Sequence, residues 1–127
     1  MPVNQTCTTD ALALELDLRV HRLRYRVTTS DELSWQLLDE QRRPLLATGA
    51  IQECLWPPVP AAFPAADDVT HALGVQFGQG GTLEWTVELV TGAGDLVSVV
   101  KQCRYDHTGT SRAWFDSLRI LITGRPA

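Results

Sequence analysis

The chain has 127 residues, a formal net charge of −4, 44% hydrophobic residues and 20% charged residues. This length fits one domain that buries a core without needing disulfides or metals, and the composition is too apolar for a disordered chain. The acidic balance is unfavourable for general nucleic-acid binding, which depends on neutralising phosphates. No stretch approaches the roughly 20 apolar residues that a membrane-spanning helix needs.

The cysteines and the first residues predict a cytoplasmic protein. Cys7, Cys54 and Cys103 are an odd number without C-x-x-C spacing, whereas secreted disulfide frameworks are usually even and denser. The first 18 residues lack the basic segment and apolar run that mark a signal peptide. We therefore expect reduced thiols and a cytoplasmic location.

Residues 12–27 show the clearest alternation of apolar and polar side chains in the chain. Apolar residues occupy every second position from Leu12 to Val20, and the series resumes one place out of phase at Leu23, Tyr25 and Val27. A one-residue phase change turns later side chains to the other face unless a β-bulge absorbs it. We therefore expect a bulge near residues 20–23, with both apolar series on one inner face.

Turn signals separate further predicted strands at residues 33–37, 45–56, 72–77, 83–89, 96–105 and 112–123. Residues 96–105 carry apolar side chains on both parities, which is typical of a strand covered in part on both sides. Prolines between residues 57 and 66 cannot donate to a strand ladder, so this segment is expected to cross between sheets. Trp35 and Trp85 lie on the apolar parity of their strands and are expected in the core.

This pattern predicts an all-β fold, a single-domain antiparallel β-sandwich of about seven to eight strands over residues 1–127. A partly closed β-barrel is the alternative. Residues 1–10 and 124–127 are expected to be loose termini.

Three arginines, Arg22, Arg24 and Arg26, are expected on the outer face of the first strands. They either pair with carboxylates on a neighbouring strand, for which Glu84 and Glu88 are candidates, or receive an acidic partner. Since a charge run is usually a solvated face, pairing is the main interpretation.

Aromatic and proline residues at strand ends form the second candidate surface. They either make an exposed partner surface or cap the open end of the sandwich. Together with the arginines, the candidate partner-binding residues are Trp56, Pro57, Pro58, Phe63, His107, Trp114, Arg22, Arg24 and Arg26.

The favoured function is a non-enzymatic binding or assembly module, acting by protein–protein contact or self-association through loops or a sheet edge. We expect no cofactor and assign no catalytic or metal-binding residue. One alternative is a calcium- or ligand-binding β-sandwich, whose ligand is a membrane surface or a carbohydrate. A second alternative is a small enzyme that uses His107 or His71 with a nearby carboxylate.

Overall fold

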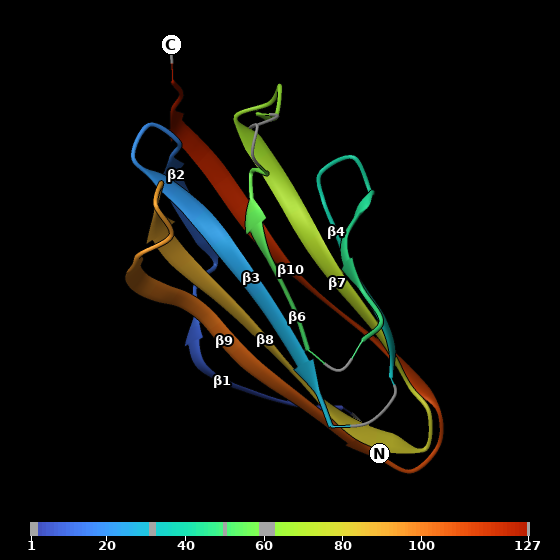
Figure 1. Cartoon of the computed structure of the whole chain (residues 1–127). Coiled ribbons are helices and arrows are strands. Elements are labelled where there is room, and N and C mark those ends of the chain that lie inside the picture. The colour runs from blue at the N-terminus through green and yellow to red at the C-terminus, as the bar shows by residue number, and fades with distance from the viewer. Residues whose placement is uncertain (1–2, 31–32, 50, 59–62, 127) are drawn as a thin grey trace.

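The computed structural model describes residues 3–30, 33–49, 51–58 and 63–126, and these residues form two five-stranded β-sheets (Figure 1). Neither sheet closes into a barrel within the described residues, so the predicted all-β sandwich is confirmed, with ten strands in place of seven or eight. No helix in this part of the chain is long and apolar enough to span a membrane. The strands are β1 (Asn4–Asp10), β2 (Ala13–Asp17), β3 (His21–Thr29), β4 (Ser34–Leu38), β5 (Pro44–Ala47), β6 (Ile51–Trp56), β7 (Asp68–Phe77), β8 (Gly80–Thr91), β9 (Leu96–Thr108) and β10 (Arg112–Gly124).

The first sheet has the order β1-β9-β8-β3-β6 and the second has the order β2-β10-β7-β4-β5. Of the nine connections between consecutive strands, seven pass from one sheet to the other, and only β4–β5 and β8–β9 are hairpins within a sheet. One of these crossings joins β6 to β7, as predicted for the proline-rich segment, although residues 59–62 lie outside the described residues. The β2–β10 pair is parallel, which departs from the expected antiparallel arrangement.

Alternate side chains of both sheets meet in one core. Trp35 and Trp85 lie in it, exposed by 3% and 0%, which confirms their predicted position. Period-two alternation has this effect because successive side chains of a strand point to opposite faces. The largest fully buried side chains are Trp85, Tyr25, Tyr105, Phe77, Lys101, Leu16, Leu23, Leu37, Leu73, Leu83, Leu118 and Ile120.

The prediction of one bulged strand over residues 12–27 is wrong. Strand β2 belongs to the second sheet and β3 to the first, and a turn at residues 18–20 connects them. In this turn the Val20 N–H donates to the Asp17 carbonyl (3.2 Å). The phase change therefore marks a crossing between sheets, which lets both apolar series face one core from opposite sides. Leu12 and Val20, expected on the inner face, lie outside the strands and are exposed by 95% and 55%.

Residues 4–10, expected to belong to a loose N-terminus, are held in the first sheet. Residues 4–10 form β1, which pairs with β9, and a disulfide joins Cys7 to Cys103, its direct partner in the register. The prediction of reduced thiols is therefore wrong for these two residues, while Cys54 is free. A disulfide is typical of an oxidising compartment, so the expected cytoplasmic location loses the support that free thiols gave it.

The C-terminal residues are also held where the structure describes them. Gly124 is the last residue of β10. Arg125 donates to Asp67 Oδ1 (2.6 Å) and to the Ala66 carbonyl (2.9 Å).

Alanine substitutions at Leu16 and Leu12 test which of these two leucines lies in the core. The two residues are four positions apart in the same alternating stretch. Leu16→Ala should lower the free energy of unfolding by about 2–5 kcal/mol, because it leaves a cavity in the core. Leu12→Ala should change it by less than about 0.5 kcal/mol, because Leu12 contacts solvent. Urea denaturation at low protein concentration measures both values, and equal losses would contradict this fold.

Candidate functional site

The aromatic and proline residues of the second candidate surface come from two segments, the crossover after β6 and the loop between β9 and β10, which lie at opposite ends of the sandwich (Figure 1). Trp56 of β6 pairs in register with Leu23 of β3, and Leu23 pairs on its other side with Leu89 of β8. His107 is opposite Gly81 of β8. Eight residues of extended strand separate Leu89 from Gly81, a distance of about 26 Å. The crossover and the β9–β10 loop therefore cannot form one continuous surface.

At the crossover end, the aromatic side chain closes the core. Trp56 is 2% exposed, and its ring meets the His71 imidazole edge-on, with 4.5 Å between the ring centroids. Pro57 is buried beside it, whereas Pro58 and Phe63 are exposed. Trp56 and Pro57 thus cap the sandwich, which is one of the two roles that the sequence left open.

At the other end, His107 is 3% exposed and its ring lies 5.6 Å from that of Phe77. Its Nε2–H donates to the Thr110 carbonyl, which closes the β9–β10 loop. Trp114 is half-buried. Both aromatic side chains are largely used within the molecule, so this end presents little of the expected aromatic patch.

The three arginines of β3 bind groups of their own chain. Arg24 Nε donates to Glu88 Oε1 (2.7 Å), one of the two partners expected from the sequence, and Arg26 pairs with Glu53 (2.9 Å). Arg22 donates through Nε to the Pro57 carbonyl (3.1 Å). Each guanidinium thus has an internal acceptor, which matches the interpretation of paired charges. The Arg24–Glu88 pair departs from the expected solvated face, because its side chains are only 20% and 10% exposed.

The acidic turn residues are likewise engaged nearby. Asp39 accepts from the backbone N–H groups of Gln41 and Arg43 (both 2.8 Å), and Asp68 pairs with Arg119. Among the described residues, one group of three potential metal ligands gathers within 4.8 Å, namely Cys7, Asp10 and Cys103. Its two sulfurs are bonded to each other, so this group does not offer the oxygen ligands that calcium prefers.

A hydrogen-bonded chain of three side chains crosses the core beside Trp56. The fully buried His71 contacts the Tyr25 hydroxyl through Nδ1 (2.5 Å) and Glu40 Oε2 through Nε2 (2.8 Å). In the neutral ring, Nε2–H donates to Glu40 and Nδ1 accepts from Tyr25. Burial lowers the pKa of His71, and the Glu40 carboxylate opposes this shift; burial also raises the pKa of Tyr25. Both ring nitrogens are therefore occupied inside the protein.

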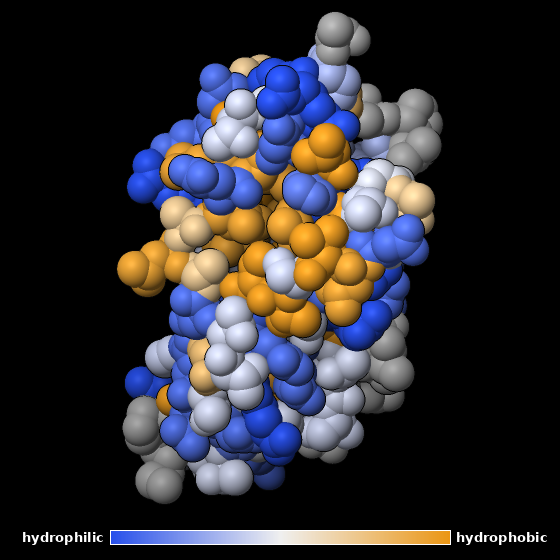
Figure 2. Space-filling view, turned by 90° about the vertical axis from the view of Figure 1, so that its left-hand side faces the viewer, coloured by the Kyte–Doolittle hydropathy of each residue, from blue (hydrophilic) through white to orange (hydrophobic). Residues whose placement is uncertain are grey.

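Three large aliphatic side chains are exposed in the part of the first sheet where β1 ends and β9 begins: Leu12 (95%), Leu96 (55%) and Val97 (49%). We call these three residues the apolar edge surface. The Ala11 N–H donates to the Val100 carbonyl (3.2 Å), which places Leu12 beside the first half of β9. Figure 2 shows apolar atoms gathered across the middle of the face on this side of the molecule, with polar atoms above and below.

The strand edge under this surface is open. β1 ends at Asp10, opposite Lys101, so among the described residues 96–99 of β9 have a strand partner only on the β8 side. The register with β8 shifts at two places here, leaving Val97 and Val100 without direct partners. Such bulges are frequent at sheet edges. The sequence gives a partial signal for this site. Apolar residues at both odd and even positions of residues 96–105 predicted that both faces of this strand would be partly covered by other parts of the protein. At Leu96 and Val97 the described residues do not provide that cover.

Comparison with known proteins does not assign the chain to a family. No family model matches the chain, and no curated protein or solved structure matches it at a significant level.

His71 makes folding stability depend on pH. Because its pKa is lowered in the folded state, the unfolded chain binds an extra proton below about pH 6.5, the usual pKa of histidine. The free energy of unfolding should therefore fall as the pH drops below this value, with a slope of at most about 1.4 kcal/mol per pH unit from this one group. Denaturation at several pH values should show this slope in the wild-type chain and its loss in His71→Gln. Equal slopes in the two proteins would show that His71 takes up its proton normally.

Proposed function

We propose that this chain is a non-enzymatic assembly module, and that a second copy of the chain covers its apolar edge surface. The observation that carries the proposal is the exposure of Leu12, Leu96 and Val97 near an open strand edge, where β1 ends and β9 begins. Single exposed apolar residues are ordinary, but an apolar group gathered in one place marks an interaction site.

The free energy available from this surface sets the expected strength of the contact. Full burial of a leucine or valine side chain contributes about 1.5–3 kcal/mol. A twofold dimer covers three such side chains from each copy, two of which are already half-buried, which gives about 9 kcal/mol in total. Loss of translational and rotational freedom on association costs about 4–15 kcal/mol. The two values are similar, so association should be reversible and should depend on protein concentration.

A second copy is the occupant that the open edge fits best. Residues 96–99 present unpaired backbone groups on one side, and an identical edge related by a twofold axis supplies complementary donors and acceptors. The two register shifts make the edge of β9 irregular, which limits backbone hydrogen bonding between the two copies. Side-chain packing around Leu12 and Val97 would therefore contribute much of the free energy of association. The same register shifts limit open-ended strand addition, which favours a closed dimer.

Two of the three histidines, His71 and His107, are buried and make contacts within the protein, which supports a non-enzymatic function. His71 uses both ring nitrogens inside the core, and the His107 Nε2–H is used in its own loop. The free thiol of Cys54 has its pKa raised to about 11 by burial, which makes it a poor nucleophile near neutral pH.

Light scattering across a protein concentration series tests the proposal. The wild-type chain should change from monomer to dimer as concentration rises, and Val97→Asp should remain monomeric because its charge would be buried in the contact. Phe115→Asp is the matched control, since Phe115 is 76% exposed on the other sheet and should leave the dimer intact. A wild-type chain that stays monomeric up to millimolar concentration, or a Val97→Asp dimer, would contradict the proposal.

A second candidate function rests on Phe115, on the outer face of the second sheet. Its ring lies over Gly74, where a Cβ atom would come within 3.3 Å of the ring. Shallow grooves of about 380 Å³ and 670 Å³ flank the ring, and the smaller one is lined by the amide side chains of Gln36 and Gln76. An exposed aromatic ring with neutral amides beside it is the chemistry of a carbohydrate-binding platform.

Nuclear magnetic resonance titration with neutral oligosaccharides tests this second candidate. Binding should shift the amide resonances of β7 and β10 around Phe115, and Phe115→Ala should abolish those shifts. Phe63→Ala, which removes another exposed ring at the crossover, is the control and should leave them unchanged. Absence of shifts with every oligosaccharide at millimolar concentration would remove this candidate.

A further inference from the structure

Strand β1 lies at the edge of the first sheet and buries almost none of its own side chains. Of its seven residues, Cys7 is half-buried and the other six are exposed. Hydrophobic burial therefore contributes little to holding β1 in place. Its attachment depends on the backbone ladder with β9, on the disulfide and on the contact between Asp10 and Lys101 at its end.

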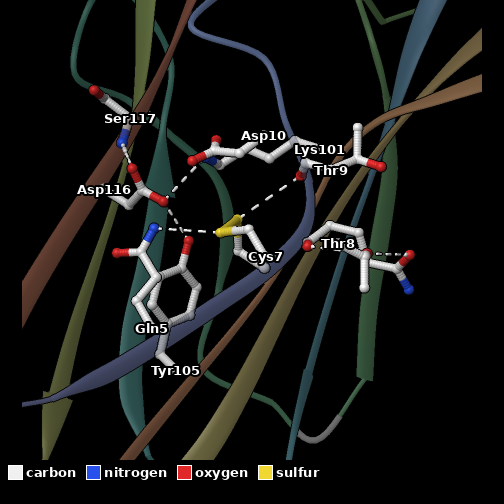
Figure 3. Close-up of a disulfide and its surroundings, with 11 residues drawn as sticks. Gln5, Cys7, Thr8, Thr9, Asp10, Lys101, Tyr105, Asp116 and Ser117 are labelled. Atoms are coloured by element: carbon white, nitrogen blue, oxygen red, sulfur yellow. Dashed lines mark hydrogen bonds and ion pairs between the residues drawn. A yellow bond between two sulfur atoms is a disulfide. The ribbon is translucent and has the colours of Figure 1, made fainter.

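Lys101 is an unusual residue for the interior. Its side chain is 1% exposed, and Nζ lies 2.5 Å from Asp10 Oδ1 and 3.1 Å from Asp116 Oδ2. The Trp85 ring, whose centroid is 5.2 Å from Nζ, lies on another side of the amine. Figure 3 shows the two carboxylates converging on this side chain beside the disulfide. The amine is thus confined against two carboxyl groups and shielded from solvent.

The two carboxylates have different surroundings. Asp116, on β10 of the opposite sheet, accepts the Tyr105 hydroxyl on Oδ2 and the Ser117 N–H on Oδ1 (2.7 Å). Its side chain is 18% exposed and is held at both oxygens. Asp10 has Lys101 as its nearest charged partner, and its side chain is 40% exposed, so one side of this carboxyl group faces solvent. Asp116 is therefore fixed for proton transfer, and Asp10 is placed to be the group that reacts.

We propose that Lys101 Nζ and Asp10 Cγ form an intramolecular amide bond, with Asp116 relaying the protons. The inference does not depend on the proposed dimer. It follows from the juxtaposition of a buried amine with two carboxyl groups at contact distance, at the end of a strand whose own side chains are mostly exposed.

The reaction balances without an added oxidant or co-reactant. Asp116 takes a proton from the Lys101 ammonium and passes it to the Asp10 carboxylate, and the neutral amine then attacks Asp10 Cγ. After the attack, Asp116 takes a second proton from the attacking nitrogen and delivers it to the hydroxyl oxygen on Asp10 Cγ. The tetrahedral intermediate then collapses with cleavage of that C–O bond, and the oxygen leaves as water. The ammonium and the carboxylate together become one amide and one water molecule, with no change in net charge.

The surroundings favour the amide over the ion pair. A buried ion pair keeps the cost of removing two charges from water, and that cost disappears when the pair becomes a neutral amide. The exposed side of Asp10 gives the released water a route to solvent. Because the Lys101 side chain is 1% exposed, water reaches the amide nitrogen poorly, and hydrolysis of the amide is disfavoured.

Intact-mass spectrometry of the folded, purified and then reduced and denatured chain tests the proposal. The wild-type chain should be one water lighter than its sequence mass. Tryptic digestion should give a branched peptide that joins the segments around residues 10 and 101, with no cleavage after Lys101. A wild-type chain at its full sequence mass, even after prolonged incubation in the folded state, would overturn the proposal.

Two variants separate the amide from other losses of water. Lys101→Arg keeps the positive charge and the ion pairs but lacks the amine, so it should have its full sequence mass. If Lys101→Arg also lost one water, the loss would come from another reaction, such as succinimide formation at an aspartate, and the amide would be excluded.

Asp116→Asn removes the proton relay and should be recovered largely at full mass. An Asp116→Asn chain that forms the bond as fast as the wild type would overturn the role assigned to Asp116.

Discussion

Packing between the two sheets is the interaction on which the rest of the structure depends. Because seven of the nine connections cross from one sheet to the other, neither sheet can be completed without its partner. Each crossing requires the next strand to present its apolar face back toward the same core, as Leu16 of β2 and Leu23 of β3 do from opposite sides. The buried polar residues fit this arrangement. His71 bridges Tyr25 of the first sheet and Glu40, which follows β4 of the second, so both of its ring nitrogens have partners within the protein.

Period-two alternation predicted the all-β sandwich and the core position of Trp35 and Trp85, and the prolines of residues 57–66 predicted the crossing between sheets. The alternation was misread in one place. It failed at residues 18–20, because a bulge within one strand and a turn between two sheets produce the same phase change in the sequence. The disulfide was missed because Cys7 and Cys103 are 96 residues apart and only the β1–β9 register brings them together. The candidate surface was missed for a related reason. Leu12 follows the alternation of its neighbours, but the backbone leaves the first sheet there and turns this side chain outward.

The end of β1 lies where the open edge of β9 begins. β1 covers β9 as far as Lys101, and the edge of β9 is open immediately beyond it. The contact between Asp10 and Lys101 thus stands at the boundary between the closed and open parts of this edge. Fixing β1 at that point holds Leu12 near the open edge of β9, so the attachment of a weakly buried strand and the integrity of the apolar edge surface are coupled. The arginines of β3 and the aromatic side chains at the two ends mainly serve internal contacts.

Hydrogen exchange measured by mass spectrometry at a series of protein concentrations tests self-association through this edge most directly. If a second copy covers the apolar edge surface, the backbone amides of residues 96–100 and of residues 11–12 should exchange more slowly as concentration rises. The amides around Phe115 should exchange at the same rate throughout. Exchange at residues 96–100 that does not change between dilute and millimolar protein would contradict the central claim, because the open edge would then stay in contact with water at every concentration.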